Sequence, residues 1–176
     1  MDRNMKPKLR CRAKDLTEIA QRYQYPREDA VLLALRDPIL ARGYLTKREL
    51  LAVARWKAPR SAGRIGANDE EYVQEITRYS LGARTERARI ETLTLLDGIQ
   101  WPCASVILHF FHRGRYPILD FRALWTVSLK VPSQYGFEFW WQYVMYCREL
   151  AEQAGLDMRT LDQALWQYSK ENQARV

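Results

Sequence analysis

The stretch "LLDGIQWPCASVILHF", residues 95–110, contains a brief interruption between two helical patterns. Gly98 follows a leucine-rich amphipathic pattern in residues 84–96, and a second apolar pattern begins about four residues later. Glycine readily adopts the left-handed conformation that ends a helix. Pro102 suits the first turn of the next helix, where a missing N–H costs nothing. We therefore expect two helices joined by a short turn over about residues 84–112.

The rest of the chain also predicts helices, because alternating strand patterns bounded by turn signals are missing. The fold class is therefore all-α. Thr46 and Glu49 have capping-box spacing, Asp157 suits the N-cap of the last helix, and "RSAGRIGA", residues 60–67, predicts a loop. Further helices are expected at about 15–24, after Pro26, from Thr46 to Lys57, from Asn68 to Leu81, from Pro102 to His112, from Asp120 onward, and at 137–154 and 158–171.

A chain of 176 residues fits one compact domain, or two helical lobes that share a core. Residues 1–14 form a basic arm that we expect to be poorly ordered, and residues 15–176 are expected to form a single helical domain. The chain has 28 basic and 21 acidic residues, a net charge of +7. This balance favours a polyanionic partner, although a merely soluble basic protein explains the charge equally well.

The cysteines and histidines indicate no metal site. Cys11, Cys103 and Cys147 are an odd number without paired spacing, which fits a reducing compartment and excludes a four-cysteine zinc or iron–sulfur site within the chain.

The N-terminus lacks the apolar stretch of a secretory signal, and no apolar run approaches the ~20 residues that span a bilayer. We therefore predict a cytoplasmic, nucleoid-associated protein without a membrane partner.

Two segments carry a resemblance to a known family. "LDGIQWPCAS", residues 96–105, resembles the helix-hairpin-helix signature of leucine, any residue, glycine, an aliphatic residue, glycine, two or three variable residues and alanine. "YPILDFRAL", residues 116–124, resembles the segment that follows this hairpin in the helix-hairpin-helix DNA glycosylase superfamily, where an aspartate begins a helix. The two segments are about as far apart as in that superfamily. The match covers residues 95–125 well, and the surrounding helical context is less specific.

The resemblance implies two helical lobes with a DNA-binding cleft between them, a helix-hairpin-helix over about 84–112 beside the cleft, and a catalytic segment over 113–128. Two departures matter: Gln100 replaces the second hairpin glycine, and Pro102 stands where bifunctional members carry a catalytic lysine. Proline has no amine that could form a Schiff base. The resemblance therefore implies a monofunctional DNA glycosylase that acts as a monomer, removes a damaged or modified base from double-stranded DNA and has no lyase activity.

Asp120 is the candidate catalytic residue, because a carboxylate near C1′ stabilises the positive charge that develops on the sugar and can orient water. An ordinary N-cap is the alternative role for this aspartate. In that case the protein would be a non-catalytic helix-hairpin-helix DNA-binding protein. For an enzyme, base excision repair is the expected role, and defence against foreign DNA that carries modified bases is a minority alternative.

A turn followed by a helix N-terminus suits a phosphate, and a flipped base needs aromatic walls. The candidate DNA contacts are Gly98, Ile99, Gln100, Trp101, Arg113, Arg115 and Arg122. Candidates for the base pocket are Trp56, Lys57, Phe121 and Trp125, although most tryptophans in a helical domain belong to the core. Arg60, Arg64, Arg84 and Arg87 are either phosphate ligands or a solvated face. No cofactor is expected beyond the monovalent cation that the turn carbonyls bind in relatives.

Overall fold

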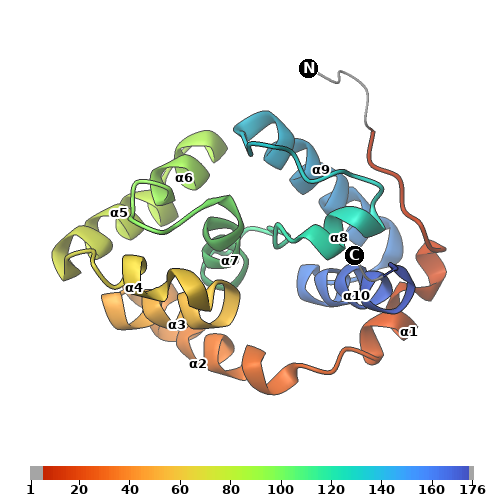
Figure 1. Cartoon of the computed structure of the whole chain (residues 1–176), viewed down its shortest axis with the longest axis horizontal. Helices are drawn as coiled ribbons and strands as arrows, with labels where there is room; N and C mark the ends of the chain where they lie inside the picture. Colours follow the sequence, from red (N-terminus) through yellow and green to blue (C-terminus); the bar gives the residue numbers. More distant parts are fainter. Residues whose placement is uncertain (1–5, 175–176) are drawn as a thin grey trace. The chain divides into compact units, whose positions relative to one another are not determined.

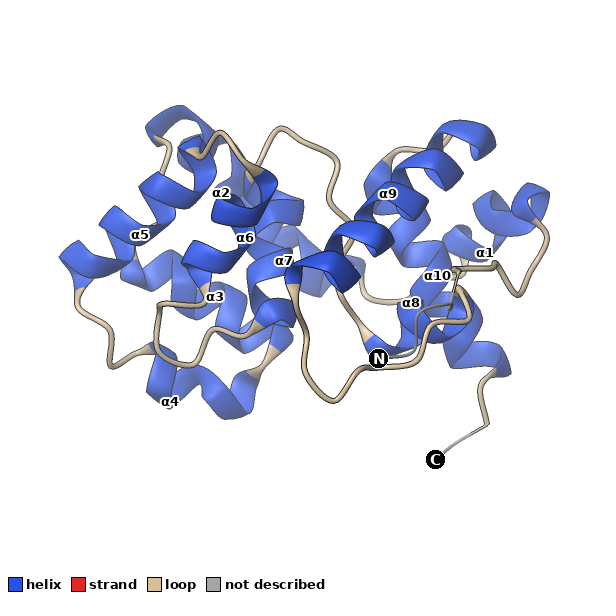
Figure 2. Ribbon diagram, turned by 90° about the horizontal axis from the view of Figure 1, so that it is seen from above, coloured by secondary structure: helices blue, strands red, loops and turns tan. Residues whose placement is uncertain are grey.

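A computed structural model describes residues 6–174, and every regular element within that range is helical. The all-α fold class is therefore confirmed for the described residues (Figure 1, Figure 2). The α-helices are α1 Leu16–Gln21, α2 Pro26–Arg42, α3 Lys47–Lys57, α4 Ala62–Ile65, α5 Glu70–Gly82, α6 Glu86–Leu93, α7 Trp101–Phe111, α8 Phe121–Thr126, α9 Phe137–Ala154 and α10 Met158–Asn172. Two 3-10 turns precede α1 and α4, η1 Ala13–Asp15 and η2 Pro59–Ser61.

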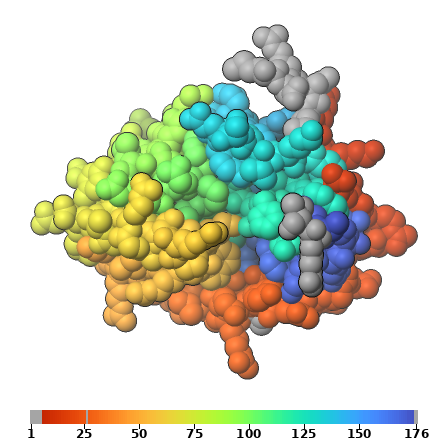
Figure 3. Space-filling model, viewed as in Figure 1, coloured from red at the N-terminus to blue at the C-terminus, as the bar shows by residue number. Residues whose placement is uncertain are grey.

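The chain separates into two compact units. Unit 1 takes the described residues of Met1–Gln24 and Tyr116–Val176, and unit 2 is Tyr25–Arg115. Unit 1 therefore combines the two ends of the chain, whereas unit 2 is one continuous segment. In the space-filling view, side chains close the gaps that the ribbon leaves between the helices of each unit (Figure 3).

Unit 2 is built around α7. This helix is apolar on nearly all sides, and such a helix is stable only when other helices surround it. It packs against α2, α3 and α6, and the side chains of Val106, Ile107 and Leu108 are fully buried. The position of α7 at the centre of unit 2 follows directly from the composition of residues 101–111.

Local capping signals placed several helix ends correctly. The Thr46 hydroxyl accepts a hydrogen bond from the Glu49 N–H, and the Glu49 carboxylate accepts one from the Thr46 N–H, so the predicted capping box at α3 is confirmed. Asp157 caps α10 through the Thr160 N–H, at 2.9 Å, as predicted. These ends were predictable because the partners lie within one turn of each other.

The boundaries predicted around α4 and α6 were wrong. Residues 60–65 form the end of η2 and the short helix α4 instead of a loop. The helix predicted over 84–96 runs only from Glu86 to Leu93. It ends early because the Thr94 hydroxyl donates to the Glu91 carbonyl, and the Leu95 N–H bonds the carbonyl three residues back. The chain then turns, so that Leu96 is buried and Leu95 is exposed.

Unit 1 consists of α1, α8, α9 and α10, with α10 in contact with each of the other three (Figure 2). The end of α8 carries a left-handed residue that is not glycine, Ser128, with φ of 59°. The N–H groups of Ser128 and Leu129 bond the carbonyls of Trp125 and Leu124, the pattern of a Schellman motif. The helix stops there with two of its last carbonyls satisfied.

Residues 6–14 of the basic arm contact the end of α8, and residues 1–5 lie outside the described range. The backbone N–H groups of Lys8 and Arg10 donate to the carbonyls of Val127 and Thr126, each at 2.9 Å. The Arg10 side chain donates from Nε to the Trp125 carbonyl at 2.6 Å. The arm is held because its backbone supplies donors to the Thr126 and Val127 carbonyls, which lie where α8 ends and its internal hydrogen bonds stop.

Candidate functional site

The turn at Gly98 in unit 2 is the first candidate site. Gly98 has φ of +79°, and the Ile99 N–H closes the turn on the Leu96 carbonyl at 3.0 Å. A Cβ at position 98 would lie 2.8 Å from Cγ1 of Ile65 and 3.2 Å from Cβ of Arg64. Glycine is therefore required both by the left-handed backbone and by the close approach of α4.

Asn68 holds this turn from outside the hairpin segment. Its side-chain amide donates to the carbonyls of Ile65, at 2.8 Å, and Asp97, at 3.0 Å, and its oxygen accepts from the Asp97 N–H at 2.9 Å. Asn68 was predicted to start a helix, but Asp69 occupies the N-cap of α5 and the Asn68 side chain is buried. No local sequence pattern predicts that Asn68 holds the turn, because its partner Asp97 lies 29 residues further along the chain.

The start of α7 offers backbone donors that its N-cap side chain does not use. Gln100 is the exposed N-cap residue and makes no side-chain cap hydrogen bond, and Pro102 lies in the first turn, as predicted. Trp101 is half-buried, whereas the Ile99 side chain is fully buried. A ligand at this turn would therefore meet the backbone at Ile99 and not its side chain.

Two cations lie near the turn in unit 2. Arg64 is exposed, and its Cβ is close to Gly98. Burial raises the pKa of the Cys103 thiol, while the charge of Lys57 partly offsets that rise, so the Lys57 ammonium is within electrostatic range of the first turn of α7. Lys57 was predicted as a base-pocket residue, and the structure places it within electrostatic range of α7. Arg113 and Arg115 are exposed beyond the end of α7.

Trp56 has a packing role in unit 2. Its indole N–H donates to a carboxylate oxygen of Asp29 at 3.2 Å. Its ring meets Phe110 edge-on, with 5.7 Å between centroids and 77° between planes. Asp29 is buried, and Trp56 is half-buried. Through these two contacts Trp56 joins α3 to α2 and α7.

Asp120 in unit 1 is the second candidate site. It is the N-cap of α8, as predicted, and its Oδ1 accepts the Arg122 N–H at 2.9 Å. The four residues before it form no regular secondary structure and are almost completely buried, whereas Asp120 itself is partly exposed. The carboxylate therefore stands at the point where a buried segment reaches the surface of unit 1.

Aromatic and cationic groups accompany Asp120. Burial raises the pKa of Tyr135, and the negative charge of Asp120 raises it further, so the two groups are within electrostatic range. The rings of Tyr135 and Phe139 are 5.8 Å apart. Tyr135 was not among the predicted site residues, since it lies in the connection before α9 and no local motif marks it. Phe121 is exposed, with the Arg122 guanidinium 5.1 Å above its ring.

Trp125, also predicted for the base pocket, is covered from two sides. The Arg10 guanidinium lies 4.5 Å from the centre of its ring. Tyr168 stacks on it with 6.2 Å between centroids and 30° between planes. The structure thus places Trp125 among the contacts that bind the N-terminal arm to α8 and α10. Unit 1 holds Asp120, Phe121, Arg122 and Trp125, and unit 2 holds the other predicted site residues.

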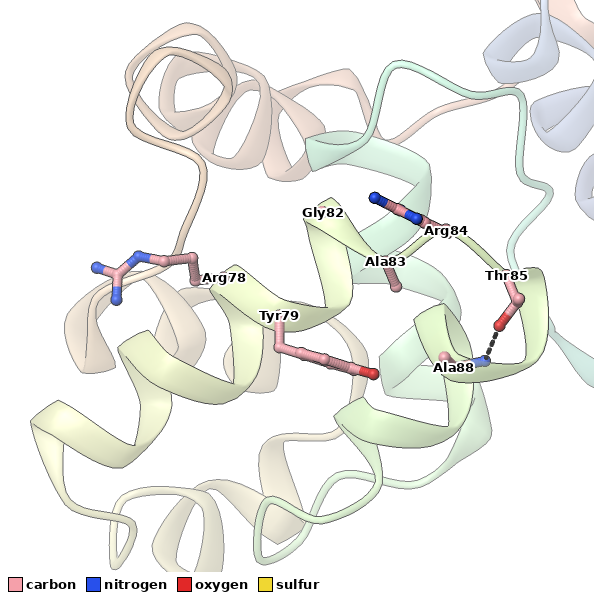
Figure 4. Close-up of a pocket in the computed structure, with 7 residues that line it drawn as sticks. All are labelled: Arg78, Tyr79, Gly82, Ala83, Arg84, Thr85 and Ala88. Carbon is pink, nitrogen blue, oxygen red and sulfur yellow. Dashed lines mark hydrogen bonds between the residues drawn. The ribbon is translucent and has the colours of Figure 1, made fainter.

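A pocket of about 430 Å³ lies at the corner between α5 and α6 in unit 2 (Figure 4). Tyr79 lies along it, while Arg78 and Arg84 extend in different directions from its rim. Thr85 caps α6 by accepting the Ala88 N–H at 3.3 Å. No lining residue carries a carboxylate, so the pocket is cationic. Its lining consists of Arg78, Tyr79, Gly82, Ala83, Arg84, Thr85 and Ala88.

Comparison of the chain with protein-family models, with curated proteins and with solved structures finds no match. Within the described residues, no three or more His, Cys, Asp or Glu side chains come together in a group that could hold a metal ion. None of the helices in residues 6–174 has both the length and the apolar character needed to cross a membrane. The cysteines at 11, 103 and 147 are free thiols.

Proposed function

We propose that this protein is a monofunctional DNA glycosylase that hydrolyses the bond between a flipped-out base and its deoxyribose and leaves an abasic site. The observation that carries the proposal is the placement of Asp120. Its carboxylate caps α8 at the surface of unit 1 and directly follows the buried segment 116–119. It follows, in chain order, a glycine turn between two helices.

The chemistry requires one carboxylate. As the base leaves, positive charge develops on the sugar, and a fixed negative group near C1′ stabilises it. Asp120 supplies that charge and can orient the attacking water. Pro102 carries no amine, so the reaction ends at the abasic site without strand cleavage through a Schiff base.

DNA binding is proposed for the Gly98 turn. The backbone donors at the start of α7, which the Gln100 side chain does not cap, and the positive end of the helix dipole suit a phosphate. Arg64 lies beside the turn, Lys57 is within electrostatic range of α7, and the net charge of +7 favours duplex DNA in general. A monovalent cation at this turn would share the carbonyl oxygens of Leu96 and Asp97 with the N–H donors that already bind them.

The helix-hairpin-helix arrangement over residues 84–112, a two-lobed glycosylase fold with a cleft, action as a monomer and a cytoplasmic location are parts of the same proposal. Tyr135 joins Phe121 as a proposed base-pocket residue, because it is half-buried and within range of Asp120. Base excision repair is the proposed role, with defence against modified foreign DNA as the minority alternative.

A second candidate function is a non-catalytic DNA-binding protein. One contact favours it: Asp120 Oδ1 accepts a hydrogen bond from the Arg122 N–H. An aspartate at an N-cap makes such a hydrogen bond whether or not it is catalytic. In that case the Gly98 turn would bind DNA and the aspartate would serve only α8.

The experiment is base release from a panel of duplexes that carry oxidised, alkylated, mismatched and bulky modified bases, with free bases identified by mass spectrometry. On the substrate found, Asp120→Asn keeps a cap acceptor and removes the charge. We expect its single-turnover rate to fall by about 10²–10³-fold, with DNA affinity unchanged or slightly higher because a negative charge is removed. DNA binding by the parent protein without release of any base would support the non-catalytic function instead.

A further inference from the structure

The buried segment before Asp120 has backbone N–H and C=O groups that need hydrogen-bond partners. Tyr116, Ile118 and Leu119 are at most 2 % exposed, and the segment forms no regular secondary structure. No strand pairs with it among the described residues. Buried N–H and C=O groups need partners, and a segment outside helices and strands has no regular backbone hydrogen bonds that would supply them. The partners must come from the helices around it.

Two side chains supply those partners at Ile118. The Ile118 N–H donates to Oδ1 of Asp162, on α10, at 3.0 Å. The Tyr143 hydroxyl, on α9, donates to the Ile118 carbonyl at 3.2 Å. Both polar backbone groups of one residue are therefore held by two different helices, two residues before Asp120.

Asp162 is a buried carboxylate, with 6 % of its surface exposed. Its second oxygen, Oδ2, bonds Arg159 at 2.9 Å, and Arg159 also donates to the Tyr23 hydroxyl at 3.4 Å. The arginine balances the charge of Asp162, and Oδ1 accepts from the Ile118 backbone. A buried carboxylate is costly unless it is paired and hydrogen-bonded, and Asp162 meets both conditions through Arg159 and Ile118.

Tyr143 is suited to its role as a donor. Its side chain is fully buried. Burial raises its pKa well above the ordinary value, and the negative charges of Asp162 and Asp120 raise it further. The hydroxyl therefore keeps its proton at physiological pH. Tyr143 is also within electrostatic range of both Asp162 and Asp120.

We propose that Tyr143 and Asp162 are positioning residues for Asp120: they fix the Ile118 backbone and thereby place the carboxylate at the start of α8. That this positioning affects catalysis rests on the proposed glycosylase function. Asp120 lies two residues after Ile118, at most about 7 Å along the chain, so displacement of Ile118 is passed on to it. In enzymes, misplacement by about 1 Å can lower the rate by about 10²-fold.

Tyr143→Phe removes one hydroxyl and keeps the ring, which makes it the principal variant. Ser169→Ala is the matched control, because Ser169 is also fully buried in unit 1 but bonds Gln173 instead of the segment. We expect the single-turnover rate constant at saturating DNA to fall about tenfold or more in Tyr143→Phe, with KM unchanged, and to stay within about twofold in Ser169→Ala. If Tyr143 only stabilised the fold, its loss would lower the fraction of active protein, which is measured as the reaction amplitude. The rate constant of the active fraction would not change.

A second measurement does not depend on catalysis. The amide resonance of Arg122 reports the cap made by Asp120, and hydrogen exchange at the Ile118 amide reports its bond to Asp162. We expect the Arg122 resonance to shift in Tyr143→Phe and not in Ser169→Ala. Ile118 exchange should be at least about tenfold faster in Asp162→Ala than in Asp162→Asn, which keeps an acceptor oxygen.

The two measurements separate the two proposals. If the parent protein releases no base, the glycosylase function fails, and the Arg122 and Ile118 amides still decide the positioning. If base release is observed but Tyr143→Phe keeps the parent rate constant and the Arg122 resonance, the positioning role is overturned while the glycosylase function stands. Equal Ile118 exchange in the Asp162→Ala and Asp162→Asn variants would also overturn it.

Discussion

Substitution of Gly98 by alanine tests the central turn of unit 2. The structure gives two separate reasons for a cost: φ is +79°, and the new Cβ would lie 2.8 Å from Cγ1 of Ile65 and 3.1 Å from its backbone nitrogen. The left-handed backbone alone costs about 1–2 kcal/mol for an L-residue. Overpacking against a buried side chain adds about 1–3 kcal/mol. We expect Gly98→Ala to lower the free energy of unfolding by about 2–5 kcal/mol.

Two other glycines of unit 2 separate these contributions. Gly43 has φ of +80° with nothing within 4 Å of a built Cβ, so Gly43→Ala carries the backbone cost without the clash. Gly63 lies in α4 with ordinary φ and open space, so Gly63→Ala carries neither and is expected to be neutral or slightly stabilising. The difference between Gly98→Ala and Gly43→Ala should be about 1–3 kcal/mol.

Urea unfolding followed by tryptophan fluorescence and circular dichroism gives these free energies. A loss below about 1 kcal/mol for Gly98→Ala, or a loss equal to that of Gly43→Ala, would refute the close packing of the turn against α4. In that case Ile65 and Arg64 would have room to move, and the hairpin would be less rigid than the reasoning requires.

The remaining predictions concern unit 1 and the capping box. Ser128→Gly relieves a left-handed φ of 59° and should stabilise the protein by about 0.5–1 kcal/mol, measured as a rise in Tm. At α3, burial raises the pKa of Glu49, but hydrogen bonds from Arg42 and Thr46 outweigh it and leave the pKa below 4.5. The stability that this ionised carboxylate contributes is therefore complete above about pH 4.5 and is lost as pH falls through the lower folded-state pKa. Glu49→Gln should cost about 1–2 kcal/mol at pH 7, and the difference from the parent in urea unfolding should shrink below pH 4.5; a difference that is constant down to pH 3 would contradict this.

The all-α class, most helix positions and the caps at Thr46, Asp120 and Asp157 were determined by the sequence alone. These features depend on residues within one or two turns of each other, so composition and spacing contain the necessary information. The glycine break at position 98 was predictable for the same reason, since the requirement for a left-handed residue is local.

The hydrogen bonds that hold these helices and turns in place could be identified only from the tertiary structure. Asn68 bonds a turn 29 residues away, the N-terminal arm binds the last carbonyls of α8, and Asp162 and Tyr143 bond the backbone of Ile118. Each of these contacts joins polar groups from distant parts of the chain. Nothing in the local sequence marks such a pair, because the need arises only when folding buries a backbone group without a partner.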